Sequence, residues 1–370
     1  MNGQTGRDII VVGASAGGLE PVLQFVEQLP AALEASVFVV IHFPPEGRSV
    51  LPQLLNRRGK LGAMHPTDGQ RIEHGYVYVG PPDRHMIVSG TRVDLVRGPQ
   101  ENGYRPSIDV LMRSAARQYG RRVIGVVLSG TLDDGTAGLM YIKRHGGVAI
   151  VQDPEEAMYP GMPRSAMENV AVDHVLSVRE MGAVILDLVS EPVEAGRAVA
   201  DEGMEFESRT AAFDPDVLHL DQREGTPSTF TCPHCHGTLW ETQDNDLPRY
   251  RCRVGHAFSP DALFAAEAES VETALWEALR ALEEMAAVSA RMSNRAERRG
   301  NARLAKRFGD QRAEAERRAE TIRTVLIATR PAEGATDDEA REDEVPAGAS
   351  AIGDNDARAA SPVRKASGSR

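Results

Sequence analysis

The chain has 370 residues, 41% hydrophobic and 26% charged, which is a composition of globular modules and excludes a wholly disordered or collagen-like chain. The formal net charge of -12 argues against a dedicated nucleic-acid binder, because such proteins carry a basic surplus that meets phosphates. No apolar run approaches the roughly 20 residues that span a bilayer, and no signal peptide opens the chain. We therefore expect a cytoplasmic protein of two or three modules with no membrane insertion.

From residue 8 to about residue 190, short β-branched runs alternate with segments whose apolar residues recur at helical spacing. Several strand-like runs are apolar throughout, as in parallel strands buried on both faces, and they include DIIVVGA, ASVFVVIH, RVIGVVLSG and GVAIVQD. This alternation predicts βαβ units and an α/β fold with a doubly wound, mostly parallel, Rossmann-like sheet. In such sheets the ligand crevice lies at the carboxyl ends of the strands.

The first strand runs into a glycine-rich turn, GASAGG, that precedes a helix. A dinucleotide-binding fingerprint would need glycine where Ser15 stands, so that the backbone could approach a pyrophosphate. Gly13-x-Ser15-x-Gly17 instead has the form of a nucleophile elbow, in which a tight turn lifts a serine above the sheet edge. A turn of small residues around an idle serine is the simpler alternative.

A nucleophilic serine needs a base, and the base needs an acceptor that orients it. His42 ends the second long strand, and Asp133 and Asp134 follow the strand VIGVVLSG. Because these strands end at one sheet edge, Ser15, His42 and an aspartate are predicted to meet there. Simpler interpretations exist: His42 could be a capping histidine, and the two aspartates could belong to a turn that begins a helix.

A different base is conceivable in the chain order of α/β-hydrolases, where the histidine follows the acid. His145 or His174 would then act, but neither ends a strand in the sequence pattern. We rank this arrangement lower.

Residues 191–229 are acidic and polar, and we interpret them as a linker. Residues 230–258 contain all three cysteines of the chain, a number that suits a metal site better than a disulfide framework. The four candidate ligands, in a C-x2-C and C-x3-H arrangement, are Cys232, Cys235, Cys252 and His256.

Four ligands of this kind suit tetrahedral Zn²⁺ and leave no open position, so we expect a structural zinc ion in a zinc-ribbon-like β module. Free buried thiols are the alternative, and His234 or His236 could substitute as ligands. The acidic surroundings favour protein contact over nucleic acid.

Residues 259–328 have apolar positions in 4-3 spacing and predict a helical hairpin or short coiled coil. Its arginine-rich stretch is interpreted as a solvated face, with docking on a helical partner or self-association as alternatives. Residues 329–370 lack aromatic residues and are expected to be disordered.

Five ordered motifs within residues 8–190 resemble the catalytic domain of the chemotaxis methylesterase, CheB. They are GASAGG, IHFPP, YRPSIDVLMRSAA, LSGTLDDGTAG and YPGMPRSAM. The resemblance implies a Rossmann-like domain that hydrolyses glutamate methyl esters on methylated chemoreceptor helices and often deamidates glutamines. It implies no cofactor for catalysis. Chemosensory signalling proteins are further expected partners, through the C-terminal helices.

The resemblance also assigns roles to residues. Ser15 would be the nucleophile, His42 the general base and Asp134 its orienting acid, with Asp133 a neighbour. The backbone N–H of Ala16 and the turn at Thr131 are the expected oxyanion donors.

Two arginines lie in matching segments and are expected to shape the substrate site. Arg105 begins RPSID, a segment that could equally be no more than a helix start. Arg164 lies in MPR and could meet an acidic receptor helix.

The sequence departs from the family pattern in three ways. Only seven residues precede the first strand, so we expect no receiver domain and no control by phosphorylation in cis. Thr131-Leu132 stand where the family has Met-Gly, which puts the oxyanion geometry in question, and Ala16 replaces a threonine.

Three hypotheses of function follow. The first is a serine esterase of methylated chemoreceptors, with a C-terminal module that localises or regulates it. The second is an inactive scaffold whose C-terminal module binds a chemosensory partner. The third is a nucleotide-binding domain, against which Ser15 already speaks.

Overall fold

A computed structural model describes residues 6–43, 47, 49–193, 202–218, 225–244 and 247–328. The predicted disordered tail, 329–370, lies outside the described residues, as do parts of the predicted linker. Among the described helices, none is both long and apolar enough to cross a bilayer.

The centre of the first half is a seven-stranded sheet of order β10-β9-β8-β1-β2-β5-β3, in which every neighbouring pair is parallel. Its strands are β1 (Ile9–Ala14), β2 (Ser36–Ile41), β3 (Gly62–Met64), β5 (Tyr76–Val79), β8 (Val123–Val127), β9 (Val148–Gln152) and β10 (His174–Leu176). The three inner strands β1, β2 and β8 are buried along their whole length, which explains their unbroken apolar sequences.

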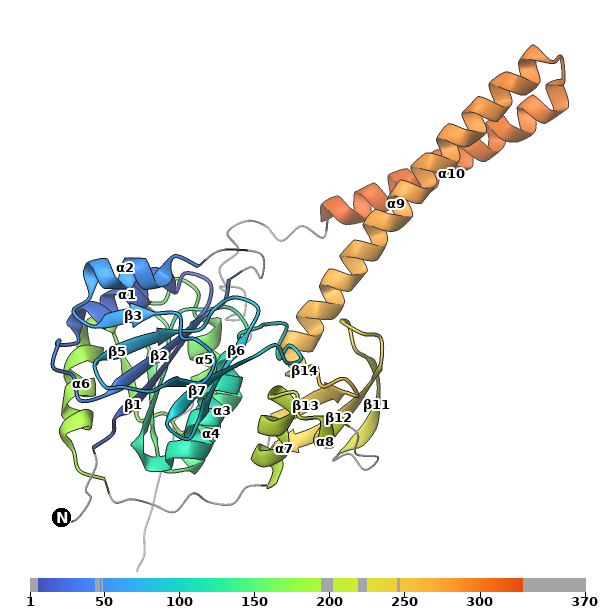
Figure 1. Cartoon of the computed structure of the whole chain (residues 1–370). Helices are drawn as coiled ribbons and strands as arrows, with labels where there is room; N and C mark the ends of the chain where they lie inside the picture. The colour runs from blue at the N-terminus through green and yellow to red at the C-terminus, as the bar shows by residue number, and fades with distance from the viewer. Residues whose placement is uncertain are drawn as a thin grey trace, which may run out of the picture. The chain divides into compact units, whose positions relative to one another are not determined.

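Helices cover both faces of this sheet (Figure 1). One face packs against α1 (Leu19–Gln28), α2 (Leu51–Arg58) and α6 (Val178–Ser190). The other packs against α3 (Ile108–Tyr119), α4 (Thr136–Arg144) and α5 (Gly161–Asn169). This confirms the predicted α/β class with its doubly wound parallel sheet.

A small antiparallel sheet of order β4-β7-β6 adds to the second face. Its strands are β4 (Gln70–Arg71), β6 (His85–Ser89) and β7 (Arg92–Val96). The chain then makes a tight turn at residues 101–104 before α3 begins.

The range predicted as a linker contains two helices, α7 (Glu202–Ala211) and α8 (Pro215–Leu218). Buried Met204 of α7 packs in the same apolar cluster as α3 and α4. The polar sequence of this range hides the helix, because its few buried apolar residues, Met204, Ala211 and Val217, do not form a continuous apolar stripe at helical spacing.

An antiparallel sheet of order β11-β12-β13-β14 follows, and we call residues 226–258 the ribbon. Its strands are β11 (Thr226–Thr231), β12 (Thr238–Asp244), β13 (Leu247–Cys252) and β14 (Ala257–Phe258). The two antiparallel strands expected between the cysteines are therefore present, and residues 245 and 246, where the turn was expected, lie outside the described residues.

Two long helices end the described chain, α9 (Pro260–Arg298) and α10 (Ala302–Ala328), with Gly300 at φ 70 in the connection. The expected helical hairpin is thus present. Among the described residues, those up to residue 274 form one compact unit, which includes the ribbon and the start of α9, and residues 275–328 belong to a second.

Candidate active site

Ser15 lies directly after β1, in the turn that leads to α1. Its N–H donates to the Ser129 carbonyl at 2.9 Å, and its carbonyl accepts the Gly18 N–H at 3.0 Å. Gly17 has φ +66, and a Cβ there would lie 2.9 Å from the Met158 Cβ. Residue 17 must therefore be glycine on both conformational and steric grounds. The hydrogen bond to Ser129 fixes the turn to the loop that follows β8.

His42 follows β2, next to β1 in the sheet. Its Nδ1 lies 3.0 Å from Ser15 Oγ, and its Nε2 lies 2.8 Å from Asp134 Oδ2. The side chain of His42 is only 5% exposed and that of Asp134 1%. Three strand ends thus bring a hydroxyl, an imidazole and a carboxylate into one chain of hydrogen bonds, as the sequence predicted.

Asp134 is the most strongly held member of this group. Its carboxylate accepts hydrogen bonds from Ser107 Oγ at 2.9 Å, the Ile108 N–H at 2.8 Å and Asn102 Nδ2 at 3.0 Å. Burial pushes its pKa up, but the hydrogen bond and charge of His42, together with these donors, bring the pKa below its ordinary value. The carboxylate is therefore ionised and fixed in orientation.

Asp133, its neighbour, faces a different partner. Its Oδ1 accepts a hydrogen bond from Ser259 Oγ at 2.8 Å. Burial, with a smaller effect from the charge of Asp134, raises the pKa of Asp133 to about 6. The two aspartates therefore differ in environment, and of the two only Asp134 is hydrogen-bonded to the imidazole.

Tyr104 is a residue of this site that the sequence analysis missed. Its ring stacks on the His42 imidazole, with centroids 3.5 Å apart and planes 7° apart. Burial raises the pKa of Tyr104, so the phenol stays protonated. The signal that could have found it is the preceding Asn102-Gly103, a dipeptide typical of tight turns.

Asn102 is the second residue missed. It has φ 52 in that turn, and its Nδ2 donates to both Asp134 Oδ1 and Asp109 Oδ2, the latter at 2.9 Å. Asp109 in turn accepts the N–H groups of Gly135 and Gly138 at the start of α4. Burial and the nearby charge of Asp134 raise the pKa of Asp109 to about 7.

The expected oxyanion donors lie beside Ser15. Among the described residues, no acceptor receives the Ala16 N–H, whereas its carbonyl accepts a hydrogen bond from Ser129 Oγ at 2.9 Å. Thr131 is exposed, and its neighbour Gly130 lies so close that a Cβ would stand 2.9 Å from the Ser15 Cβ. Leu132, where the family has glycine, adopts φ 59.

The two arginines expected to shape the site lie differently. Arg105 is largely turned into the protein, where it pairs with Asp83 and donates to the Gly98 carbonyl at 2.6 Å. Arg164 is exposed on α5. The substrate contacts of both residues stay predictions.

The alternative bases lie away from the carboxyl ends of the strands. His145 follows α4 and its Nδ1 donates to the Tyr141 carbonyl at 2.8 Å, and His174 begins β10. Both stand where a strand is about to start, at the opposite edge of a parallel sheet from Ser15.

A buried cluster of charges lies behind the turn at residues 101–104. Glu101 is 0% exposed and pairs with Arg113 at 2.9 Å, Arg249 at 3.3 Å and Arg251 at 3.2 Å. Burial raises the pKa of Glu101, but the charges of these arginines outweigh it and hold that pKa well below its ordinary value. Sequence analysis had no signal for this cluster, because its members are scattered over some 150 residues.

The cysteine cluster lies in the ribbon. The three cysteines form no disulfide, and the four candidate ligand atoms lie within 4.8 Å of one another. The distances are 3.6 Å between Cys235 Sγ and Cys252 Sγ, and 3.7 and 3.6 Å from His256 Nδ1 to the sulfurs of Cys232 and Cys252. Metal bonds of about 2.3 Å give a tetrahedron with edges of roughly 3.8 Å, so the donors fit such an ion.

Comparison with known proteins adds a family. Residues 10–185 match the model of the CheB methylesterase family. Over 195 residues the chain is 34% identical to a protein-glutamate methylesterase/protein-glutamine glutaminase of Photorhabdus laumondii, covering 52% of this chain and 54% of the relative. A relative of the same name, numbered 1, from Geobacter metallireducens is 36% identical over 177 residues, covering 47% of this chain and 48% of the relative.

A solved structure is also similar, the Thermotoga maritima CheB methylesterase catalytic domain. It has 31% sequence identity and a TM-score of 0.47, and the match covers 49% of this chain and 98% of that one. The chain spans about half the length of the curated relatives it matches.

Proposed function

Because residues 10–185 belong to the CheB methylesterase family, we propose that the chain is a serine esterase that hydrolyses glutamate methyl esters on chemoreceptors. Its relatives are named protein-glutamate methylesterase/protein-glutamine glutaminase, so deamidation of receptor glutamines is the second reaction we propose. We place both reactions in the cytoplasm. The observation that carries the proposal is the hydrogen-bonded chain of Ser15, His42 and Asp134.

The reaction follows from this geometry. Ser15 Oγ attacks the ester carbonyl carbon while His42 Nδ1, at 3.0 Å, takes the hydroxyl proton. Asp134 stays ionised and stabilises the imidazolium through Nε2. His42 then gives the proton to departing methoxide, which leaves as methanol, and the glutamate acyl group stays on Ser15.

Water completes the cycle. His42 removes a proton from a water molecule, the resulting hydroxide adds to the acyl carbonyl, and the ester bond to Ser15 breaks. Ser15 recovers its proton and the receptor keeps a free carboxylate. With a glutamine substrate, ammonia leaves in place of methanol.

The oxyanion that forms in each step needs donors already aimed at it. We assign the first oxyanion donor to the Ala16 N–H, because it has no acceptor among the described residues and belongs to the residue after the nucleophile. We assign the second donor to the turn at Thr131. Tyr104, whose ring stacks on His42, orients the imidazole.

The experiment is methanol release from methylated receptor membranes. We expect Ser15→Ala to abolish release, and His42→Gln to lower kcat by about 10⁴-fold or more, because each removes a member of one catalytic unit. Release that persists in Ser15→Ala would leave the scaffold hypothesis standing. Saturable binding of a dinucleotide would favour the nucleotide-binding hypothesis.

We also propose that Cys232, Cys235, Cys252 and His256 hold a zinc ion with a structural role. Three thiolates and an imidazole at these spacings fit a closed tetrahedral site, and the small apolar interior of the ribbon needs such support. Zinc content of about one per chain, lost in Cys235→Ser, is the expected measurement.

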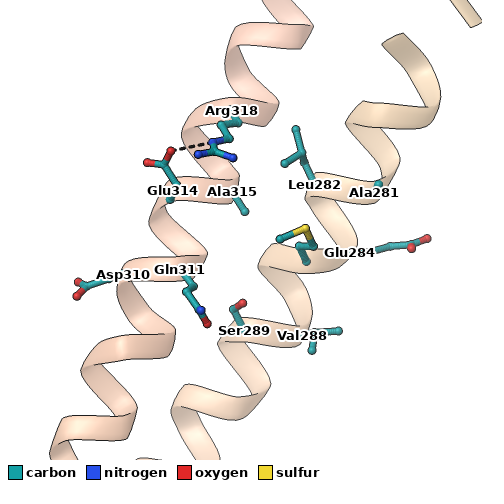
Figure 2. A pocket seen from close by; sticks show the side chains of 11 residues that line it. Ala281, Leu282, Glu284, Val288, Ser289, Asp310, Gln311, Glu314, Ala315 and Arg318 are labelled. Carbon is teal, nitrogen blue, oxygen red and sulfur yellow. Dashed lines mark hydrogen bonds and ion pairs between the residues drawn. The ribbon is translucent and has the colours of Figure 1, made fainter. Parts of the chain in front are cut away.

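The helical hairpin is proposed to bind a helical chemosensory partner. A groove of about 740 Å³ runs between α9 and α10 and is lined by Leu282, Met285, Val288 and Ala315 (Figure 2). Met285 and Val288 are 59% and 54% exposed, and charges such as the Arg318–Glu314 pair border the groove. This apolar floor with a charged rim would fit an amphipathic helix of a receptor bundle. Met285→Glu should then raise KM for the receptor without changing kcat.

A further inference from the structure

The ribbon contacts the α/β domain at the turn that carries Tyr104. The Asn102 N–H donates to the Ala257 carbonyl at 2.8 Å, and the Ala257 N–H donates to the Gln100 carbonyl at 3.2 Å. The Ser259 N–H donates to Asn102 Oδ1 at 3.0 Å. The turn at residues 101–104 is therefore hydrogen-bonded to β14 as if it were a further strand of the ribbon.

The same turn touches the candidate triad on its other side. Asn102 Nδ2 donates to Asp134 Oδ1 at 3.0 Å, and Tyr104 stacks on His42. The side chain of Asn102 thus accepts a hydrogen bond from Ser259, the residue that follows the ribbon, and donates one to the carboxylate that orients the imidazole. A small displacement of the turn changes both contacts at once.

Buried charges fix this turn in place. Arg249 and Arg251 of β13 are each 4% exposed, although they lie in a module with little core of its own. Both bind Glu101, and Arg249 Nη1 also lies 3.4 Å from Asp109 Oδ2. Without the ribbon, Glu101 would retain only Arg113 of its three arginine partners, and a buried carboxylate with fewer partners would pull the turn toward water.

The candidate metal ligands adjoin the residues that make these contacts. Arg251 directly precedes Cys252, and His256 directly precedes Ala257. The Cys252 N–H donates to the His256 carbonyl at 2.9 Å, so the two ligands face each other across the β13–β14 hairpin. An ion bound to this pair would fix the register of the hairpin, and with it the positions of Arg251 and Ala257.

We propose that the ribbon is a positioning element of the esterase site, and that metal binding at Cys232, Cys235, Cys252 and His256 sets the activity of the triad through the turn at residues 101–104. This deepens the proposed function and rests on it. Arg249, Arg251 and Ser259 are positioning residues, because they act through Glu101, Asn102 and Asp133 and not on the substrate.

The apolar layers of the α/β domain take only one partly buried residue, Leu247, from the ribbon. The residues of both layers come from the segment before residue 190, with Met204 and Leu247 as additions to one of them. Metal removal should therefore leave the sheet and its helices folded while the turn shifts. This separates a positioning role from a general loss of structure.

The test uses the full chain in three forms: zinc-loaded, stripped by a chelator under reducing conditions, and stripped then reloaded with zinc. We expect stripping to lower kcat for methanol release by about 10- to 100-fold with little change in KM, and reloading to restore it. The rate at which a fluorophosphonate labels Ser15 should fall and recover in parallel, which gives a readout that needs no receptor.

The pH profile supplies a second readout. Asn102 lowers the pKa of Asp134, so a displaced turn should raise that pKa and move the acid limb of kcat to higher pH. Ser259→Ala, which removes the hydrogen bond to Asp133, should lower kcat by about 3- to 10-fold in the zinc-loaded chain. Ser228→Ala is the matched control, because Ser228 bonds to Leu239 inside the ribbon and should leave kcat unchanged.

The outcomes are distinguishable. Loaded chain that neither releases methanol nor reacts with the fluorophosphonate would defeat the proposed function itself. Active loaded chain whose stripped form keeps the same kcat and labelling rate would overturn the ribbon's role. Stripping that also abolishes hydrogen-exchange protection of the sheet amides in residues 8–190 would overturn positioning in favour of a merely structural ion.

Discussion

The α/β domain and the ribbon both contain buried residues, but different interactions stabilise the two regions. The domain has two apolar layers, one on each face of the sheet, in which strands such as β1 and β8 are fully buried. The ribbon has a small cluster around Cys232, Leu239 and Phe258, and it attaches through buried arginines.

The candidate site therefore depends on the two regions in different ways. Apolar burial is non-directional, so the domain supplies a stable frame from which strand ends project. Ion pairs and hydrogen bonds are directional and fail when one partner is lost, so the ribbon interface can place a turn accurately and can also release it. The candidate triad depends on both regions, because β1, β2 and β8 lead to its members and the turn at residues 101–104 braces them.

The largest expected effect on kcat concerns a residue that a strand of the α/β domain leads to. Asp134→Asn keeps the shape of the side chain but removes the charge that stabilises the imidazolium, so we expect kcat to fall by about 10⁴-fold. Steady-state methanol release measures it. A fall of less than 10-fold would mean that Asp134 does not orient His42.

The next effect tests the interface. Glu101→Gln leaves Arg113, Arg249 and Arg251 without the carboxylate they share, and we expect the free energy of unfolding to fall by about 3–5 kcal/mol. Because Glu101 also holds the turn, kcat should fall as well. Denaturant unfolding and methanol release are measured on the same samples.

The matched control is a change in the apolar frame. Leu55→Ala in α2 should cost a similar 2–5 kcal/mol by leaving a cavity, yet keep kcat within about twofold at temperatures below its Tm. Equal losses of kcat in Leu55→Ala and Glu101→Gln would contradict the division between frame and interface.

A smaller effect concerns pH. The pKa of Asp133 is raised to about 6 in the folded chain against about 4 unfolded, so its ionisation opposes folding, in part above pH 4 and fully above pH 6. Asp133→Asn keeps an acceptor for Ser259 and should raise the free energy of unfolding by about 1–2 kcal/mol at pH 8, and by less at pH 5. Urea unfolding at both pH values tests this, and a gain independent of pH would refute it.

The smallest effect concerns one backbone angle. Leu132 has φ 59, a conformation that costs a residue with a Cβ about 1 kcal/mol, so Leu132→Gly should stabilise the chain by up to that amount. Gly90→Ala is the inverse control, since Gly90 has φ +57 with open space around its Cβ position and should lose a similar amount. Thermal unfolding resolves both, and a stabilising Gly90→Ala would contradict the argument.

Much of the α/β domain could be predicted from sequence, because its information is local. Unbroken apolar strands, helical periodicity and small-residue turns each act within some ten residues, and parallel strands then share one edge for their carboxyl ends. Ser15, His42 and the pair Asp133 and Asp134 follow such ends, so the meeting of a serine, a histidine and an aspartate was predictable, whereas the choice of Asp134 came from the family resemblance. The cysteine spacing indicated, in the same way, four candidate metal ligands, whose donor atoms the structure brings within 4.8 Å of one another.

The contacts that brace the site could not be predicted. Tyr104 and Asn102 stand in a turn whose sequence indicates only a bend, and Glu101 and Arg249 are 148 residues apart along the chain. Charged side chains that are buried in pairs give no periodic signal in the sequence. For the same reason the polar sequence of residues 202–218 was interpreted as a linker, although it forms helices. Local patterns in the sequence therefore determined the parallel sheet and the strand ends that carry the candidate triad. The tertiary structure alone decided which buried charges and hydrogen bonds stabilise that site, because a buried charge is stable only beside partners that the fold brings to it.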